Sequence, residues 1–265
     1  MSINKEEYIE SMRRLEFSDE TKEKMIGNLT KISTPGSGGV MKKGIKAGKA
    51  VIIAAACVMI FGVTAAAAGI ASVVVSHNRL GSRTDDFGKL SELEEKVGLN
   101  VTAVDSFSNG YIFDHMEIQD STEQDENGND LESYSGIDLQ YVKEGSPEVW
   151  INMDPARMYD ESYEADKAQE TREVNGIKLY YSCDEYLFLP ATEEDLATEE
   201  EHKREEEDPH FFISYGSDER ELTYTSFVTF VMDDVMYCML SFDTNMTSEE
   251  MLDMAEEIIT ASSIS

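Results

Sequence analysis

Residues 50–75 read AVIIAAACVMIFGVTAAAAGIASVVV and contain no charged side chain, no proline and no amide side chain. At about 1.5 Å per residue, a helix of this length reaches about 39 Å, more than the roughly 30 Å hydrocarbon core of a bilayer. In lipid the backbone must satisfy its own hydrogen bonds, so a single apolar run of this kind crosses as a helix. The sequence therefore predicts one transmembrane helix over 50–75.

Two alternatives for this stretch stay open. It could be a buried helix of a soluble domain, although nothing else in the chain is apolar enough to surround it. It could also be a cleaved signal peptide, with small residues at 66–68 as the cleavage site. However, 49 residues precede the run, and it is longer than the apolar region of a signal peptide. An uncleaved signal-anchor fits the pattern better.

The charges on either side of the apolar run predict its orientation. Residues 41–49 hold four lysines and no acid, whereas only Arg79 and Arg83 precede the acids on the other side. Residues 1–49 carry 10 Lys and Arg against 7 Asp and Glu, and residues 50–265 carry 12 against 47. Because basic flanks stay inside, we expect the N-terminus in the cytoplasm and residues 76–265 outside, in contact with the cell envelope.

These patterns divide the chain into five parts. We expect a cytoplasmic helical segment over 1–33, a basic hinge over 34–49, the span over 50–75, a linker over 76–86 and an outer domain over 87–265. The outer part is long enough for one globular core. Its net charge of −35 excludes nucleic acid as a partner and disfavours anionic lipid, while cations, basic peptides and cationic wall components remain compatible.

The cytoplasmic segment shows two short amphipathic helices. Asn4 and Ser18 are placed as N-caps, and Asp19 and Glu20 in the second helix favour the helix dipole. Apolar residues then recur at helical spacing. The candidate partner-binding residues on these apolar stripes are Tyr8, Ile9, Met12, Leu15, Met25, Ile26 and Leu29.

Helices this short do not form a stable core alone, so their apolar stripes need a partner. The membrane surface is one candidate, but an interfacial helix usually has a basic polar face, and residues 1–40 carry 6 basic and 7 acidic side chains. A protein partner fits this charge balance better. The simplest alternative is that the two helices pack on each other and only tether the anchor.

The outer segment reads as an α+β domain in which helices pack on one face of a curved, mostly antiparallel sheet. We expect helices over 86–99 and after Met246, turns at Asn175-Gly176 and Asp233-Asp234, a polar hairpin loop over 120–132 and an acidic exposed helix or insertion over 191–208. The predicted strands are Val101–Val104, Tyr111–Ile118, Tyr134–Val142, Val149–Met153, Ile177–Tyr181, Tyr186–Leu189, Phe211–Tyr215, Leu222–Met232 and Val235–Phe242.

No pattern for catalysis, a cofactor or a metal stands out, so we expect a protein that is not an enzyme. Residues 123–128 resemble half of an EF-hand loop, but Tyr134 occupies the position of the bidentate acid, and an Asn-Gly turn accounts for the stretch better. Cys183 and Cys238 could form a disulfide, although two buried thiols on strands are the commoner outcome. A hydrolase is the weakest of the functions considered.

The whole layout resembles the membrane-anchored anti-sigma factors of Gram-positive bacteria. The opening NKEEYIESMRRLEFSDETKEKMIGNL is similar to their short helical N-termini. The outer segments are similar to an uncharacterised C-terminal domain often attached to such proteins: LSELEEKVGLNV, SNGYIFDHMEIQD, SGIDLQYV, VNGIKLYY and TSEEMLDMAEEII. Residues 1–49 contain no His and no Cys, which excludes the subtype with a cytoplasmic zinc site.

This resemblance implies a single-pass regulator of transcription. The cytoplasmic helices would sequester an extracytoplasmic-function sigma factor, and the outer domain would sense the state of the envelope through an unknown ligand or protease. The leading alternative is a membrane-tethered extracytoplasmic binding protein with no role toward a sigma factor.

Overall fold

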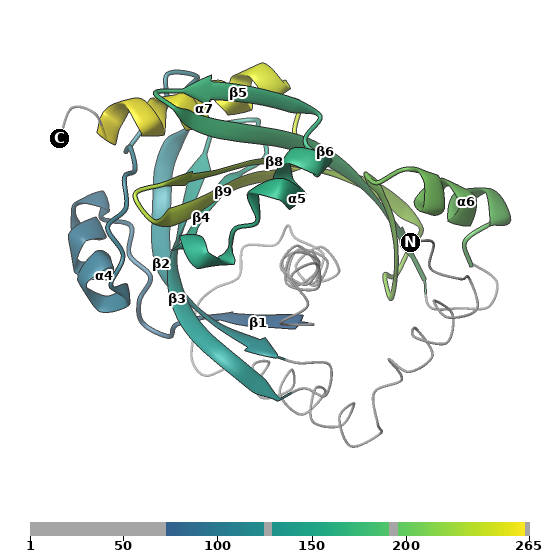
Figure 1. The fold of residues 1–265 in the computed structure, drawn as a ribbon, viewed down its shortest axis with the longest axis horizontal. Coiled ribbons are helices and arrows are strands. Elements are labelled where there is room, and N and C mark those ends of the chain that lie inside the picture. The colour runs from purple at the N-terminus through teal and green to yellow at the C-terminus, as the bar shows by residue number, and fades with distance from the viewer. Residues whose placement is uncertain (1–72, 125–128, 191–195, 263–265) are drawn as a thin grey trace. The chain divides into compact units, whose positions relative to one another are not determined.

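A computed structural model describes residues 73–124, 129–190 and 196–262 of the chain, all within one compact unit. In these residues nine strands form one curved sheet that does not close, with the order β1-β2-β3-β4-β9-β8-β6-β5 and β7 beside β6 (Figure 1). A few helices accompany it. The predicted α+β class with a curved, mostly antiparallel sheet is confirmed.

The elements have the following bounds. The strands are β1 Val73–Asn78, β2 Ile112–Gln124, β3 Asp130–Val142, β4 Val149–Pro155, β5 Glu170–Val174, β6 Ile177–Leu189, β7 Phe211–Tyr215, β8 Glu221–Met232 and β9 Val235–Phe242. The helices are α4 Leu90–Val97, α5 Glu161–Lys167, α6 Glu199–Glu207 and α7 Ser248–Ser262, with two 3-10 turns, η1 Phe87–Lys89 and η2 Ala156–Met158.

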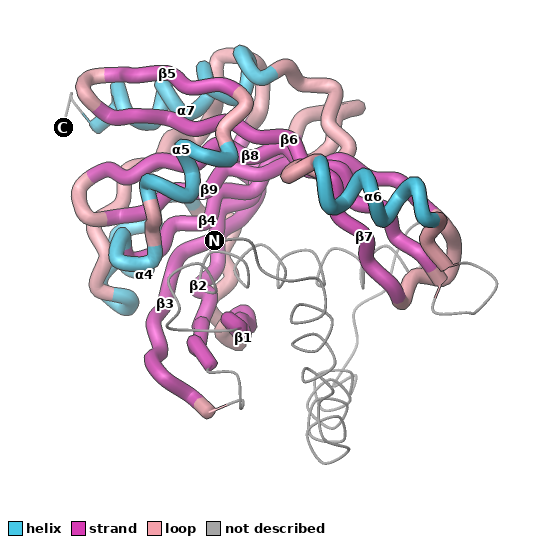
Figure 2. The backbone as a smooth tube through the Cα atoms, turned by 45° about the vertical axis from the view of Figure 1, so that its right-hand side comes forward, coloured by secondary structure: helices cyan, strands magenta, loops and turns pink. Residues whose placement is uncertain are grey.

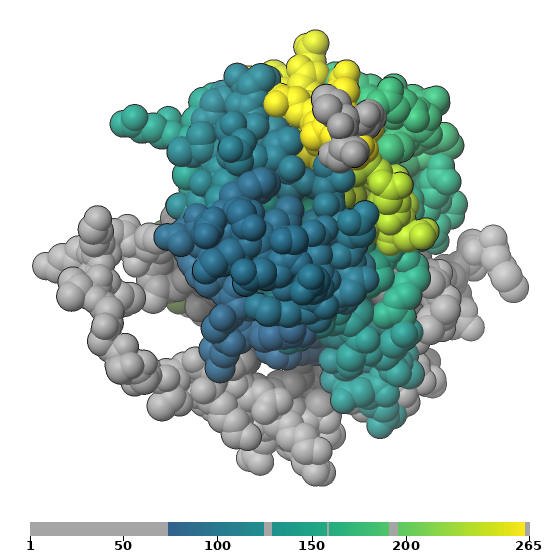
Figure 3. Space-filling view, turned by 90° about the vertical axis from the view of Figure 1, so that its left-hand side faces the viewer, coloured from purple at the N-terminus to yellow at the C-terminus, as the bar shows by residue number. Residues whose placement is uncertain are grey.

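The main core lies between one face of the sheet and the helices α4 and α7. Alternate residues of the strands point to this face, because side chains alternate along a strand. Ile137 and Leu139 of β3 are fully buried there, together with Met251 and Ile258 of α7. Figures 1 and 2 show α4 and α7 on the outer side of the curve, and Figure 3 shows α7 in yellow beside the blue segment that contains α4. We call the opposite, concave side of the sheet the inner face.

Both predicted hairpin turns are present. Asn175 and Gly176 both have positive φ, as do Asp233 and Asp234. Two-residue turns with positive φ match the twist of antiparallel strands, and Asn, Asp and Gly tolerate that backbone best. The predicted C-terminal helix begins where expected, with Thr247 and Glu250 exchanging the hydrogen bonds of a capping box.

The acidic segment over 191–208 has a topological role. β7 pairs with β6 in parallel, whereas the other strand pairs are antiparallel. A parallel pair needs a crossover connection, and this segment supplies it with the exposed helix α6. Within the described part of the segment, the predicted exposed helix is therefore confirmed. The two predicted strands over 177–189 are one continuous strand, β6.

Two predictions of local structure are wrong. Residues 101–104 are not a strand, because their backbone groups bond to side chains of the sheet: Thr102 N–H donates to Tyr237 Oη at 2.8 Å, and Val104 O accepts from Tyr141 Oη at 2.7 Å. The predicted loop over 120–132 is mostly strand. β2 runs to Gln124 and β3 starts at Asp130, because polar side chains on this arm pair across the strands.

The first strand, β1, begins earlier in the chain than the predicted start of the outer domain. β1 pairs with β2 from Val73 to Asn78, so the last three residues of the predicted span and the first three of the predicted linker lie in the sheet. A run of β-branched valines favours a strand over a helix. Residues 50–72 lie outside the described residues. No helix within the described ranges is long and apolar enough to cross a bilayer.

Candidate functional site

The inner face of the sheet is divided into a polar half and an apolar half. Paired strand positions place its side chains in rows that run across the sheet. One row runs His115, Gln140, Trp150, Leu240, Phe227; the next runs Glu117, Asp138, Asn152, Cys238, Thr229. Polar side chains thus come from β2, β3 and β4, and mostly apolar ones from β9 and β8.

The polar half contains three acids that we call the carboxylate cluster: Glu117, Asp138 and Asp154. Each is less than a tenth exposed. Asp138 accepts a hydrogen bond from Gln119 Nε2 at 2.9 Å and another from Asn152 Nδ2 at 2.7 Å. Glu117 accepts one from Asn78 Nδ2 of β1 at 2.6 Å. Amide side chains, which carry no charge, therefore supply these partners.

The hydrogen bonding of this region is incomplete. Asp154 Oδ2 and His115 Nε2 have no hydrogen-bond partner, although both residues are only 2% exposed. His115 Nε2 lies 4.0 Å from Glu117 Oε1, so it faces the carboxylate cluster. Each unsatisfied buried group costs about 1–3 kcal/mol. A ligand that supplied a charge or donors here would recover part of that cost.

Burial makes Asp138 and Asp154 difficult to ionise. It raises the pKa of Asp138 to about 8, and the charges of Asp154 and Glu117 act in the same direction, while the hydrogen bonds from Asn152 and Gln119 oppose the shift. Burial also raises the pKa of Asp154 to about 7. A nearby cation would favour the charged forms of both groups and lower these pKa values.

We expect the variant Asp138→Asn to remove part of the pH dependence of stability. An unfolded Asp has a pKa of about 3.9, so folding takes up a proton between pH about 4 and about 8, and the folded state loses stability as the pH rises across that window. Asn cannot lose a proton, and an amide flip of Gln119 or Asn152 would preserve the hydrogen bonding. Relative to wild type, the variant should gain about 1–3 kcal/mol, or about 3–10 °C in Tm, between pH 5 and pH 8.

Thermal melts of the two proteins at pH 5, 6, 7 and 8 check this result. Comparing the variant with wild type at each pH removes the contribution of Asp120. The hydrogen bond with Arg79 lowers the pKa of Asp120 to about 2, so the stability from this contact is lost only at pH values below about 4. A Tm difference that stays constant from pH 5 to pH 8 would contradict the expectation.

We call the apolar half of the inner face the apolar centre: Trp150, Phe227, Cys238, Leu240 and Phe242. These side chains form a contact cluster separate from the main core. Two acids lie beyond it, toward β6. Glu164 of α5 accepts a hydrogen bond from Thr229 Oγ1 at 2.7 Å, and Asp184 of β6 lies 2.7 Å from His210 Nδ1. Burial raises the pKa of both acids, and His210 opposes the shift for Asp184. The apolar centre therefore has carboxylates on both sides.

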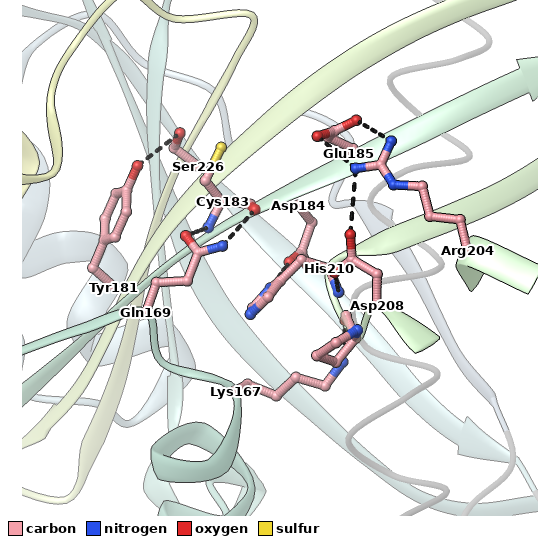
Figure 4. Close-up of polar contacts among 11 residues, drawn as sticks. Lys167, Gln169, Tyr181, Cys183, Asp184, Glu185, Arg204, Asp208, His210 and Ser226 are labelled. Carbon is pink, nitrogen blue, oxygen red and sulfur yellow. Dashed lines mark hydrogen bonds and ion pairs between the residues drawn. The ribbon is translucent and has the colours of Figure 1, made fainter. Parts of the chain in front are cut away.

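The polar contacts around β6 are structural. Figure 4 shows His210 directed to Asp184, with the Cys183 sulfur pointing away from it, as alternation along the strand requires. Cys183 and His210 therefore do not form a nucleophile–base pair. Arg204 of α6 binds Glu185 at 2.9 Å and stacks on Phe211, which holds the α6 crossover against the sheet.

Neither Cys183 nor Cys238 forms a disulfide, and β8 lies between their strands. The sequence favoured two buried thiols on strands; Cys238 is buried, whereas Cys183 is only partly buried. The described ranges contain no group of three or more His, Cys, Asp or Glu side chains arranged to hold a metal ion.

None of the residues on the inner face is among the site residues that the sequence predicted. Acids at alternate strand positions, as in Met116-Glu117-Ile118, look like a solvated face. Asn152 in the middle of a strand is the one local sign, because Asn is depleted in strands. The predicted partner-binding residues lie outside the described residues: Tyr8, Ile9, Met12, Leu15, Met25, Ile26 and Leu29.

No protein-family model, curated protein or solved structure matches the chain.

Proposed function

We propose that the protein is a single-pass membrane anti-sigma factor. Its cytoplasmic helices would sequester an extracytoplasmic-function sigma factor, and its outer domain would report the state of the envelope. The observation that carries the proposal is the arrangement of one apolar run between an N-terminal part of net charge +3, residues 1–49, and a folded domain of strongly negative charge. A regulator that couples the two sides of a membrane needs these three parts.

The start of the sheet supports a coupling role. β1 begins at Val73, still within the apolar run, and is an edge strand held by β2. Arg79, just after β1, forms a bidentate ion pair with Asp120 of β2, which fixes the end of the strand. The sheet therefore begins directly after residues 50–72 in the sequence, so a change in the sheet would act close to the proposed span.

The alternative is a membrane-tethered binding protein without a role toward a sigma factor. The inner face, with its carboxylate cluster and apolar centre, is compatible with both functions. What separates the two is the partner of residues 1–33.

Affinity purification tests this difference. The tagged full-length chain should recover a sigma factor from detergent-solubilised membranes, and a variant lacking residues 1–33 should not. A preparation in which no sigma factor depends on residues 1–33 would favour the tethered binding protein.

We expect the N-terminus inside the cell and the C-terminus outside. In a background with Cys57, Cys183 and Cys238 replaced, a membrane-impermeant thiol reagent should label a cysteine placed at Ser265 and miss one placed at Ser37. The reason is the lysine-rich flank before the apolar run. Lysed cells, in which both positions should react, are the control. Labelling at Ser37 in intact cells would reverse the topology.

A further inference from the structure

We propose that the carboxylate cluster is a pH switch, which keeps β1 paired with β2 while its acids are protonated and loosens β1 when they ionise. The inference rests on the proposed sensing role of the outer domain and names a rise in external pH as the signal. A proton needs no binding cleft, because brief local openings of a sheet bring water to a buried carboxyl. Such a switch is therefore compatible with side chains that are less than a tenth exposed.

The three acids lie close together on neighbouring strands. Glu117 pairs with Asp138 across β2 and β3, and the side chains of such a pair start about 5 Å apart. The charges of Asp154 and Glu117 both oppose the ionisation of Asp138. Buried carboxylates at this spacing repel each other when both are charged, so the closed sheet favours the protonated cluster.

Lysine and arginine supply no counter-charge to the cluster within the described ranges. None of them forms an ion pair with any of its three acids. The arginines of this region have other partners: Arg79 binds Asp120, Arg83 contacts His115 Nδ1, and Arg157 binds Glu132. Ionisation therefore places uncompensated negative charge inside the sheet, which is costly until water reaches it.

The other side chains that face the cluster are mostly uncharged. On the described strands beside it these are Ser76, Asn78, Met236 and the titratable His115, Glu123, Tyr134 and Cys238. His115 Nε2 lies 4.0 Å from Glu117 Oε1. Burial raises the pKa of Tyr134, and the charge of Asp154 acts in the same direction, so this phenol stays neutral. The acids of the cluster therefore dominate the charge of this region.

β1 is the element that this charge loosens most easily. It is an edge strand, so it can leave β2 without breaking any other strand pair. On the side of the cluster, Asn78 donates to Glu117 at 2.6 Å, and Ser76 bonds Ser121 at 2.8 Å. When Asp138 ionises beside Glu117, release of Asn78 lets water solvate both carboxylates.

The end of β1 is also held by a contact that does not respond to pH in this range. Arg79 and Asp120 form the bidentate ion pair described above, and the hydrogen bond with Arg79 lowers the pKa of Asp120 to about 2. This pair therefore stays charged above about pH 4. β1 is thus held at Arg79 and loosens toward Val73, the end that continues the apolar run.

β1 loosens as the pH rises rather than as it falls. Burial raises the pKa of Asp138 to about 8, against about 3.9 for a solvated Asp, so opening releases a proton between these pH values. Each pH unit in that window favours the open form by up to about ten-fold. The closed form is thus most stable in acid and loses stability up to pH about 8, and Asp154, with a pKa of about 7, acts in the same direction.

Hydrogen exchange of the backbone amides tests the switch. The full-length protein in uncharged maltoside micelles is placed in deuterated buffer at pH 6, 7 and 8, and exchange is followed by mass spectrometry. Dividing the intrinsic exchange rate by the measured rate gives a protection factor, which removes the ordinary pH dependence of exchange. Between pH 6 and pH 8 the protection of β1 should fall about ten-fold or more. The control is β5, the edge strand at the other end of the sheet, whose protection should change less than about three-fold.

Matched variants assign the effect to the cluster. In Asp138→Asn the loss at β1 should shrink to less than about three-fold, because Asn has no proton to release. Glu164→Gln removes another buried acid of the inner face, which bonds Thr229 of β8, and should keep the wild-type response.

Four outcomes would overturn the proposal: flat protection of β1 in the wild type, a parallel loss at β5, an unchanged response in Asp138→Asn, or an equal reduction in Glu164→Gln. The first two need no variant, so the test does not depend on how a variant folds. The measurement involves no sigma factor, so its failure is distinguishable from failure of the anti-sigma function.

Discussion

On the proposed anti-sigma function, a Leu15→Ala, Leu29→Ala double variant should release the sigma factor and raise transcription of the genes that this factor controls. The charges of residues 1–40 nearly cancel, so affinity for a protein partner has to come from the apolar stripes. Truncating one buried anchor in an interface typically costs about 1–3 kcal/mol, which is roughly 5- to 150-fold in affinity. Loss of two anchors should therefore leave little bound partner at cellular concentrations.

The measurement is a reporter fused to a promoter of the regulon, with an immunoblot of the membrane fraction to show that the variant is present. The matched control is Lys22→Ala with Lys24→Ala, two changes in the second predicted helix that leave the apolar residues of its stripe in place. Charges at the rim of an interface mainly alter the on-rate and salt dependence, so this control should have a much smaller effect. If the leucine variant leaves transcription unchanged and the lysine variant raises it, the binding surface of residues 1–33 is electrostatic. No response from either variant would favour the tethered binding protein.

The parts of the fold that the sequence predicted correctly depend mainly on interactions between residues close together in the chain. The turns at 175–176 and 233–234 and the capping box of α7 depend on residues next to one another in the chain, and all were predictable. The apolar alternation of β9 was likewise visible in the sequence. The segment 101–104 looks like a strand locally, but its backbone bonds to Tyr141 and Tyr237, which are far away in the sequence.

The inner face was beyond prediction for a related reason. Glu117, Asp138 and Asp154 are separated by up to 37 residues, and each alternates with apolar neighbours as a solvated side chain would. They form a cluster only because β2, β3 and β4 pair in one register. The division of the face also requires β4 to pair with β9, which follows far later in the chain. Neither the register nor that pairing has a local signal.

A Gly136→Ala variant should destabilise the outer domain and displace an acid of the cluster. A Cβ added at Gly136 would lie 2.8 Å from Met153 O, a backbone atom, and closer still to Asp154 Oδ1. The neighbouring strand would have to move, because a carbonyl of a paired strand cannot rotate away. Overpacking of this kind costs about 2–3 kcal/mol, or about 4–12 °C in Tm for a domain of this size. Thermal melts followed by circular dichroism would measure the loss.

Two further variants separate the causes. Gly88→Ala adds a methyl group whose nearest neighbour is the Asp86 carboxylate at 3.2 Å, so its Tm should stay within about 2 °C of wild type. In a Gly136→Ala, Asp154→Ala double variant the side-chain clash disappears while the clash with Met153 O remains, so stability should recover only in part. Full recovery would assign the whole cost to the carboxylate, and no loss in Gly136→Ala would refute the close contact. The glycine thus leaves room for a buried carboxylate at that position, which links the packing of β3 on β4 to the chemistry of the inner face.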